Sequence, residues 1–200
     1  MGAPGIRRCT PNDIGALYDI CLRTGDAGGD ATELLDDPLL LGDLFVVPYA
    51  VLEPEHAFVV DDGTGAAVGY IVGALDTRAF ETRCEAEWWP EARRRHADPA
   101  GEHGLDGLFL GWLHGPATAP DELVASYPSH LHIDLLPSVQ GQGWGRRLME
   151  TLFDALRAGG SRGVHLGVAE ENRRAIAFYE HLGMTKLGTD GFSRTYVQEL

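Results

Sequence analysis

Apolar and polar residues alternate in several segments of the chain, and this two-residue period predicts β-strands. Three apolar residues alternate with two polar ones in residues 131–135, and the same period recurs in 164–168. Residues 57–61 and 66–75 are apolar, β-branched runs, and the Asp-Gly-Thr-Gly sequence between them is a hairpin signal. Further short strands are predicted at 4–9, 184–187 and 192–198.

Other segments place apolar residues three or four positions apart, which predicts amphipathic helices. The first helix begins at Thr10, which can cap it and is followed by a proline suited to a first turn, and Gly25 ends it. A second helix closes at Gly159-Gly160. A third helix is predicted over 171–181.

The middle of the chain is less regular. Residues 76–128 are long for a simple connection between two strands. Within them, apolar residues four apart predict a helix over 80–88 that ends near Pro90, whereas 105–113 is interpreted as a folded loop. Residues 26–54, acidic and broken by prolines, predict short helical pieces. The strands and helices that alternate in the last third indicate an α/β or mixed α+β fold with a crossover unit.

Composition narrows the class of protein. No apolar run is long enough for a transmembrane helix, and no secretory signal is visible. Three cysteines without a Cys-x-x-Cys pair indicate reduced thiols, so a cytoplasmic location is expected. The net charge is −14, and Arg93–Arg95 is the one dense basic stretch. We therefore expect a single domain over residues 1–200 that binds neither nucleic acid nor membrane. An acidic surface favours cationic partners such as amines, although its commonest role is solubility.

The stretch Gln140-Gly141-Gln142-Gly143-Trp144-Gly145 places three glycines at the start of a predicted helix. The first N–H groups of a helix have no internal partner, and the helix dipole makes that end positive. A turn with few side chains can therefore bind an anion, and Arg146 and Arg147 could add charge. Two interpretations stay open: a site for the diphosphate of a nucleotide-type cofactor, or a turn that lets strand and helix pack closely. The spacing matches neither the dinucleotide fingerprint nor the P-loop.

This stretch follows a predicted strand that ends before Pro137, and Asn172 precedes Phe178-Tyr179 further along the chain. In this order the motifs resemble those of the GNAT superfamily of acetyl-CoA-dependent N-acetyltransferases. The resemblance implies a central mixed sheet of about six to seven strands flanked by helices, with residues 76–128 as a large insertion between the third and fourth strands. The insertion also looks similar to that of the acetyltransferase-like domain of animal O-GlcNAcases.

The resemblance implies an enzyme whose acyl donor is acetyl-CoA, with the diphosphate on the glycine turn and the pantetheine arm near an asparagine. The backbone N–H of Leu135 or Leu136 would face the thioester oxygen, and Tyr179 would donate a proton to the CoA thiolate. The residues implied to hold acetyl-CoA are Leu135, Leu136, Gln140, Gly141, Gln142, Gly143, Trp144, Gly145, Arg146, Asn172 and Phe178.

The general base stays open at this point. His130, His132 and Asp134 share one face of their strand. His132 has a suitable ordinary pKa, and Asp134 could orient it or bind the amine. The same trio could bind a metal or have a structural role, and no base is needed if the amine loses its proton to water. We predict no metal.

The acceptor is predicted to be a primary amine of a small molecule or a peptide. Its pocket is expected to lie between the insertion and the first helix. Candidates for its walls, which suit a hydrophobic core equally well, are Trp88, Trp89, Trp112 and His114. A homodimer is compatible with the sequence. The alternative function is a catalytically silent module on the same fold that binds CoA or another protein.

Overall fold

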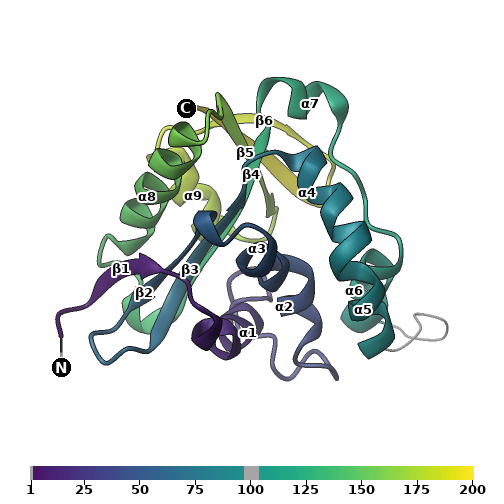
Figure 1. Cartoon of the computed structure of the whole chain (residues 1–200), viewed down its shortest axis with the longest axis horizontal. Coiled ribbons are helices and arrows are strands. Elements are labelled where there is room, and N and C mark those ends of the chain that lie inside the picture. Colours follow the sequence, from purple (N-terminus) through teal and green to yellow (C-terminus); the bar gives the residue numbers. More distant parts are fainter. Residues whose placement is uncertain (1, 97–103) are drawn as a thin grey trace.

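The computed structural model describes residues 2–96 and 104–200. At its centre is a seven-stranded mixed sheet in the order β1-β2-β3-β4-β5-β7-β6 (Figure 1). Its strands are β1 Gly5–Arg8, β2 Ala57–Asp61, β3 Ala67–Ala74, β4 Ser129–Leu135, β5 Gly163–Ala169, β6 Thr185–Thr189 and β7 Ser193–Glu199. Neighbouring strands are antiparallel except β4 and β5. The mixed sheet predicted from the sequence is confirmed.

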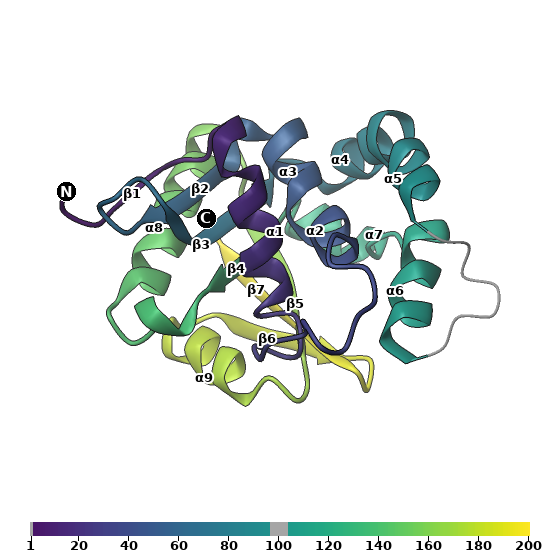
Figure 2. The same ribbon diagram turned by 90° about the horizontal axis from the view of Figure 1, so that it is seen from below.

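Helices cover both faces of this sheet (Figures 1 and 2). Helices α8 and α9 pack on one face, and α1 to α6 contribute to a second core on the other. The helices are α1 Ile14–Leu22, α2 Leu40–Phe45, α3 Val47–Leu52, α4 Thr77–Arg83, α5 Trp89–Arg95, α6 Gly104–His114, α7 Asp121–Ser126, α8 Trp144–Ala158 and α9 Arg173–His181. Short 3₁₀ segments cover Pro11–Asp13, Pro54–His56 and Pro137–Val139. Among the described helices, none combines the length and apolar composition that crossing a bilayer requires.

The alternation along the strands sorts side chains between these two cores. On β3, Tyr70 faces the core of α1, whereas Ile71 faces the core of α8. Leu131 of β4 also belongs to the α8 core. Because side chains alternate along a strand, the polar positions His132 and Asp134 project to the side of α1 and the insertion.

The insertion is more helical than the sequence predicts. The helix expected over 80–88 does not end near Pro90, because a π-helical turn over Cys84–Trp88 leads directly into α5. Proline lies in the first turn of α5, where its missing N–H would have no partner in any case. The loop interpretation of 105–113 is also wrong, since these residues lie in α6. This helix buries Phe109, Leu110 and Leu113 at helical spacing.

The sheet opens between β4 and β5. Strand β3 pairs with β4 along six residue pairs as far as Leu135. In contrast, β4 and β5 pair only at Ser129–Val164 and His130–His165. Beyond His130 the two parallel strands separate, and the carboxyl half of β4 has an unpaired backbone edge. The crossover between these strands runs through α8, whose first turn follows the opening.

Shortening a core side chain of α8 tests this arrangement. Leu152 is fully buried, so Leu152→Ala is expected to lower the free energy of unfolding by about 2–5 kcal/mol in urea denaturation. The control Leu187→Ala, at a leucine of β6 that is 55% exposed, is expected to change it by less than about 0.5 kcal/mol. Equal losses in the two variants would contradict the packing described.

Candidate active site

The pairing of β4 distinguishes between its two candidate backbone donors. The N–H of Leu136 donates to the carbonyl of Val68 at 3.0 Å and is therefore held by the sheet. Leu135 lies opposite Gly69, the next pair along. In an antiparallel ladder, successive residues direct their N–H groups to opposite sides, so the N–H of Leu135 points into the opening beside β5. The side chain of Gln140 donates to the Leu135 carbonyl at 2.6 Å and fixes the end of the strand.

The three glycines after β4 have different structural roles. Gly141 and Gly143 have positive φ angles of 74° and 82°, a conformation that glycine adopts without strain. A methyl group added to either would meet no atom within 4 Å, so the space beside them is open. At Gly145, a Cβ atom would lie 3.0 Å from the ring of Phe178. Close packing therefore explains Gly145, whereas the other two glycines shape an open turn.

This open turn leads into the N-terminus of α8, a helix of 15 residues. Gly143 is its N-cap residue and offers no side chain to the free N–H groups of the first turn. Arg146 is exposed in this turn, and the guanidinium of Arg147 lies 4.9 Å from the ring centroid of Trp144. Free N–H groups, a helix dipole and nearby cations together suit a diphosphate.

Arg174 of α9 also lies at this site, although its sequence position does not reveal it. Its guanidinium donates to the side-chain oxygen of Gln140, so it joins α9 to the glycine turn across the opening. Nothing in the local sequence pattern marks it, because the contact depends on how α9 packs beside β4. Asn172 is the N-cap of the same helix and accepts the N–H of Ala175 at 3.0 Å. Its amide also faces Gly28, where an added Cβ atom would lie 3.2 Å from the amide nitrogen of Asn172.

Tyr179 lies on the buried side of α9, with 6% of its surface exposed. Its hydroxyl has no hydrogen-bond partner among the described residues, and no fully buried polar side-chain atom there lacks one. The hydroxyl must therefore reach accessible space. Burial, with a smaller contribution from the charge of Asp134, raises the pKa of Tyr179 above its usual value. The phenol consequently keeps its proton at physiological pH and can act as a donor.

Asp134 combines a hydrogen bond from a buried tyrosine with a strongly shifted pKa. The hydroxyl of Tyr70 donates to its carboxylate at 2.5 Å. Burial raises the pKa of Asp134 to about 7, although the hydrogen bonds from Tyr70 and Thr24 act in the opposite direction. A carboxylate with this pKa is ionised in part at neutral pH and binds a proton more tightly than an ordinary one, which suits general-base catalysis.

His130 is occupied by a directional chain of hydrogen bonds. The hydroxyl of Thr77 donates to the Pro128 carbonyl at 2.7 Å, so it must accept from Nδ1–H of His130 at 2.8 Å. The Nε2 atom then accepts from the hydroxyl of Tyr49 at 2.7 Å. Burial, followed by the neighbouring His165 and His132, holds the pKa of His130 well below its usual value. This histidine is therefore neutral and positions its neighbours.

His132 is also disfavoured as a base. Burial and the nearby His165 lower its pKa to about 4, so its protonated form is unstable at neutral pH. Its ring lies 5.3 Å from that of Tyr49 and 5.6 Å from that of Phe45. The sequence favours His132 as the base, with Asp134 orienting it or binding the amine. The pKa shifts favour the opposite assignment, because Asp134 binds a proton more tightly than His132, which packs against aromatic rings.

The insertion reaches this wall through aromatic contacts. Trp112, which is 46% exposed, lies 6.0 Å from the ring of Phe45. Trp88 donates through Nε1 to the backbone carbonyl of Asp43 at 3.0 Å. Trp89 is buried in the core, and His114 is exposed at the end of α6. Of the four predicted wall residues, Trp112 makes an aromatic contact with Phe45, whose ring lies beside that of His132.

A cavity of about 760 Å³ lies at the amino end of β4. Its lining includes His130 and His165, residues of α4, residues 116–119 and Asp121. Arg78 and Glu81 of α4, which form an ion pair at 2.7 Å, both line this cavity. This volume is in the range of small-molecule sites.

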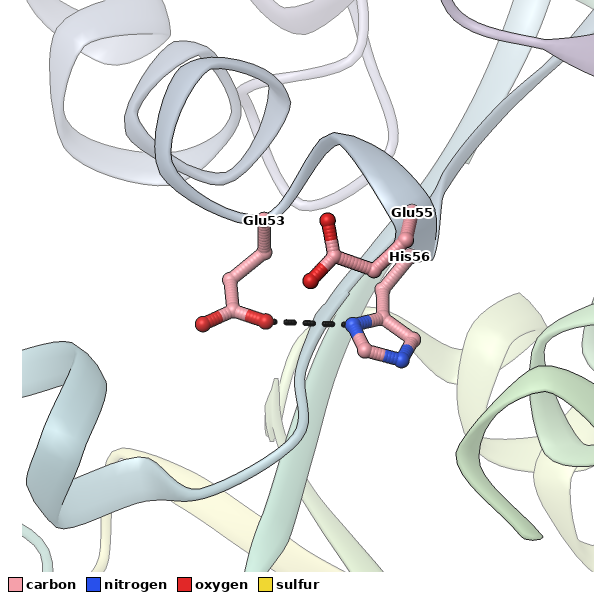
Figure 3. Close-up of side chains that lie close together, drawn as sticks. All are labelled: Glu53, Glu55 and His56. Carbon is pink, nitrogen blue, oxygen red and sulfur yellow. Dashed lines mark hydrogen bonds and ion pairs between the residues drawn. The ribbon is translucent and has the colours of Figure 1, made fainter. Parts of the chain in front are cut away.

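One group in the described residues has ligand atoms close enough to share a metal ion: Glu53, Glu55 and His56, whose atoms lie within 4.8 Å of one another (Figure 3). It precedes β2, two strands away from β4. His56 Nδ1 already lies 3.1 Å from one oxygen of Glu53, and Arg83 lies 3.7 Å from the other. The positive charge of Arg83 opposes a bound cation. In the part of the chain that is described, the trio on β4 does not form such a group.

Comparison with known proteins agrees with this geometry. The model of the acetyltransferase (GNAT) family matches residues 30–184. The chain belongs to the GNAT family. The predicted family and fold are thereby confirmed, and the GNAT relatives found include N-acetyltransferases.

Several GNAT relatives resemble the chain over most of its length. Protein O-GlcNAcase of Rattus norvegicus is 28% identical over 96% of this chain, which spans 21% of that protein. Mycothiol acetyltransferase of Beutenbergia cavernae is 32% identical over 82% of this chain and 52% of its own length. The solved structure named SsHAT is 40% identical, covers 98% of both chains and has a TM-score of 0.91. The structure of yncA from Salmonella typhimurium with its cofactor acetyl-CoA shares the GNAT fold, with a TM-score of 0.56 at 16% identity.

The raised pKa of Asp134 has a measurable consequence for stability. An ordinary aspartate has a pKa near 3.9, so the folded state binds this proton more tightly than the unfolded chain. The wild-type protein therefore loses stability as the pH rises towards and through 7. In urea denaturation, the free energy of unfolding of Asp134→Asn relative to that of wild type is expected to rise by about 2 kcal/mol between pH 5.5 and pH 8.

Asp154→Asn on the exposed side of α8 serves as the control and is expected to show no such growth. A pH-independent difference between Asp134→Asn and wild type would exclude the raised pKa.

Proposed function

We propose that this domain transfers the acetyl group of acetyl-CoA to a primary amine by direct attack of the amine on the thioester. The observation that carries the proposal is the opening between β4 and β5, where the N–H of Leu135 faces an unpaired space. An extended pantetheine arm can occupy the place of the missing strand pairing. The open glycine turn at the end of β4 then receives the diphosphate.

In this arrangement the chain would polarise the thioester through its backbone. The N–H of Leu135 would donate to the thioester oxygen as negative charge develops there. A preorganised donor of this kind contributes roughly 3–4 kcal/mol in comparable sites. Gln140 would support it, because its bond to the Leu135 carbonyl holds the end of the strand in place.

Asp134 would remove the proton of the incoming amine. It lies on the same strand as the Leu135 donor, and its side chain projects to the side of α1 and the insertion. The amine would therefore approach from that side, while acetyl-CoA lies in the opening. Tyr179, from the other side of the opening, would face the departing thiolate. Because the pKa of Tyr179 exceeds the value near 8.5 of a thiol, full proton transfer to the free thiolate would be unfavourable. The phenol would instead donate a hydrogen bond to the sulfur while the C–S bond breaks, and the thiolate would take its final proton from the phenol or from solvent.

The acceptor side would be formed by α1, α2 and the insertion of residues 76–128. The wall of Phe45 and Trp112 borders His132, and the cavity at the amino end of β4 could hold the remainder of a larger acceptor. A small molecule or a peptide amine fits this class. The free thiols of Cys9, Cys21 and Cys84 support a cytoplasmic location as part of the proposal.

Acetyl-CoA binding is expected to depend on Gly143. In Gly143→Glu, the side chain would enter the open turn and repel the diphosphate, so calorimetric titration should show at least a hundredfold weaker binding than in wild type. Gly160→Glu is the matched control: Gly160 also has a positive φ and open space, but it lies beyond the other end of α8. Loss of binding in both variants, or in neither, would contradict a diphosphate site at Gly143.

The pH dependence of turnover is expected to identify the base. With acetyl-CoA and a panel of spermidine, tyramine, glucosamine and Nα-acetyl-lysine amide, kcat/KM should rise with pH through a value near 7. Asp134→Asn should abolish this limb, whereas His132→Gln should keep it. The opposite pattern would assign the base to His132.

Removing the hydroxyl of Tyr179 is expected to slow the release of CoA. Tyr179→Phe should lower kcat roughly a hundredfold with little change in acetyl-CoA affinity, because the ring still packs under the opening. Tyr196→Phe is the matched control, because it removes the hydroxyl of a neighbouring buried tyrosine that donates to Glu180. Unchanged turnover in Tyr179→Phe would remove it as the acid.

A further inference from the structure

Three side chains of the insertion converge on Asp43 of α2. Trp88 binds the backbone carbonyl of Asp43, as described above. Arg95 Nη2 lies 3.1 Å from its carboxylate. His96, the residue after α5, places Nε2 2.7 Å from the second carboxylate oxygen. The Asp43 carboxylate is fully buried, so these contacts replace water.

The same carboxylate is tied to α1. The hydroxyl of Tyr18 donates to Asp43 at 2.5 Å. His96 extends the network in the other direction, because its Nδ1 lies 2.6 Å from the carboxylate of Asp37. Asp43 therefore joins α1, α2 and the insertion at one buried point.

The geometry around His96 favours a positively charged imidazolium. Its side chain is 1% exposed, and each ring nitrogen faces a carboxylate, which can only accept when it is ionised. The positive charges of His96 and Arg95 balance the negative charges of Asp37 and Asp43 within the network. A buried network with balanced charge fixes one geometry, and loss of one member leaves an uncompensated charge.

This network holds the aromatic wall that Phe45 and Trp112 form beside His132 of β4. Asp43 lies two residues before Phe45, whose ring borders His132. The rings of Phe109 and Trp112 of α6 lie 5.9 Å and 6.0 Å from Phe45. A change at Asp43 is therefore close to the ring of Phe45, which contacts both α6 of the insertion and His132 of β4.

We infer that His96 and Asp43 are positioning residues that lock the insertion onto α1 and α2 and thereby fix the acceptor wall formed by Phe45 and Trp112. The role of this wall in acceptor binding rests on the proposed function; the lock itself does not.

The lock responds to pH with a defined sign. The hydrogen bond to Asp43, followed by that to Asp37, raises the pKa of His96, and burial acts in the opposite direction. The lock therefore stabilises the fold below the ordinary histidine pKa near 6.5, and its contribution disappears as the pH rises through the raised value.

The charged and titratable groups around His96 come from several elements. Asp37 precedes α2, Asp43 lies in α2, Arg95 is the last residue of α5, and Tyr18 faces Asp43 from α1. Asp106 of α6 binds the N–H of Asp36 nearby, at 3.1 Å.

The test compares His96→Gln and the isosteric Asp43→Asn with wild type, using His181→Gln at an exposed histidine of α9 as control. Amide hydrogen exchange at pH 6.5 is expected to be at least tenfold faster in residues 40–52 and 104–114 of both lock variants and unchanged in 144–158. The difference between His96→Gln and wild type should shrink as the pH is raised towards 9. The control should match wild type throughout.

Steady-state kinetics provide the second readout. With whichever amine of the panel wild type turns over fastest, both lock variants should raise the KM for the amine at least fivefold and leave the KM for acetyl-CoA within twofold. Equal acceleration of exchange in 144–158, or an equal rise in both KM values, would overturn the inference, because either shows general destabilisation. Unchanged exchange in 40–52 would overturn it as well. If wild-type protein binds no acetyl-CoA, the proposed function fails, and the exchange data still test the lock.

Discussion

The separation of β4 from β5 is the constraint on which the site depends. The two strands pair at only two positions, and from there onward the edge of β4 that faces β5 has no strand partner. Because β3 engages Leu136, the free donor next to the glycine turn is Leu135. The glycine turn, the N-terminus of α8 and Arg174 all lie around the end of the same strand. A thioester cofactor with an extended, hydrogen-bonding arm and an anionic head fits this sequence of features.

Burial then sorts the polar residues of β4 by role. The same low polarity raises the pKa of Asp134 and lowers the pKa values of His130 and His132. A carboxyl group is disfavoured when charged and becomes a stronger base, whereas an imidazole in the same place becomes a weaker one. The lock at Asp43 applies burial differently, since His96 is compensated there by two carboxylates and remains charged.

Most of the part of the site proposed to bind acetyl-CoA can be predicted from the sequence. Alternating apolar residues and apolar, β-branched runs predict the strands, and the stretch from Gln140 to Gly145 predicts the turn. Whether a glycine bends the chain or allows close packing cannot be read from its identity. Gly143 has a positive φ, whereas Gly145 lies within α8 and is packed against Phe178 of α9. The acceptor side was harder to predict. The pattern of residues 105–113 does not reveal helix α6, and the positions of Arg174, Asp43 and His96 depend on contacts between segments distant in the chain.

The most direct measurement is the backbone amide resonance of Leu135 during titration with acetyl-CoA. The account predicts that this amide exchanges freely with water in the free protein and becomes protected, with a downfield shift, when acetyl-CoA binds. The amide of Leu136 should be protected throughout, because Val68 already accepts its proton. If acetyl-CoA protects Leu136 and leaves Leu135 unchanged, or binds without affecting either amide, the opening of the sheet is not where the thioester is held.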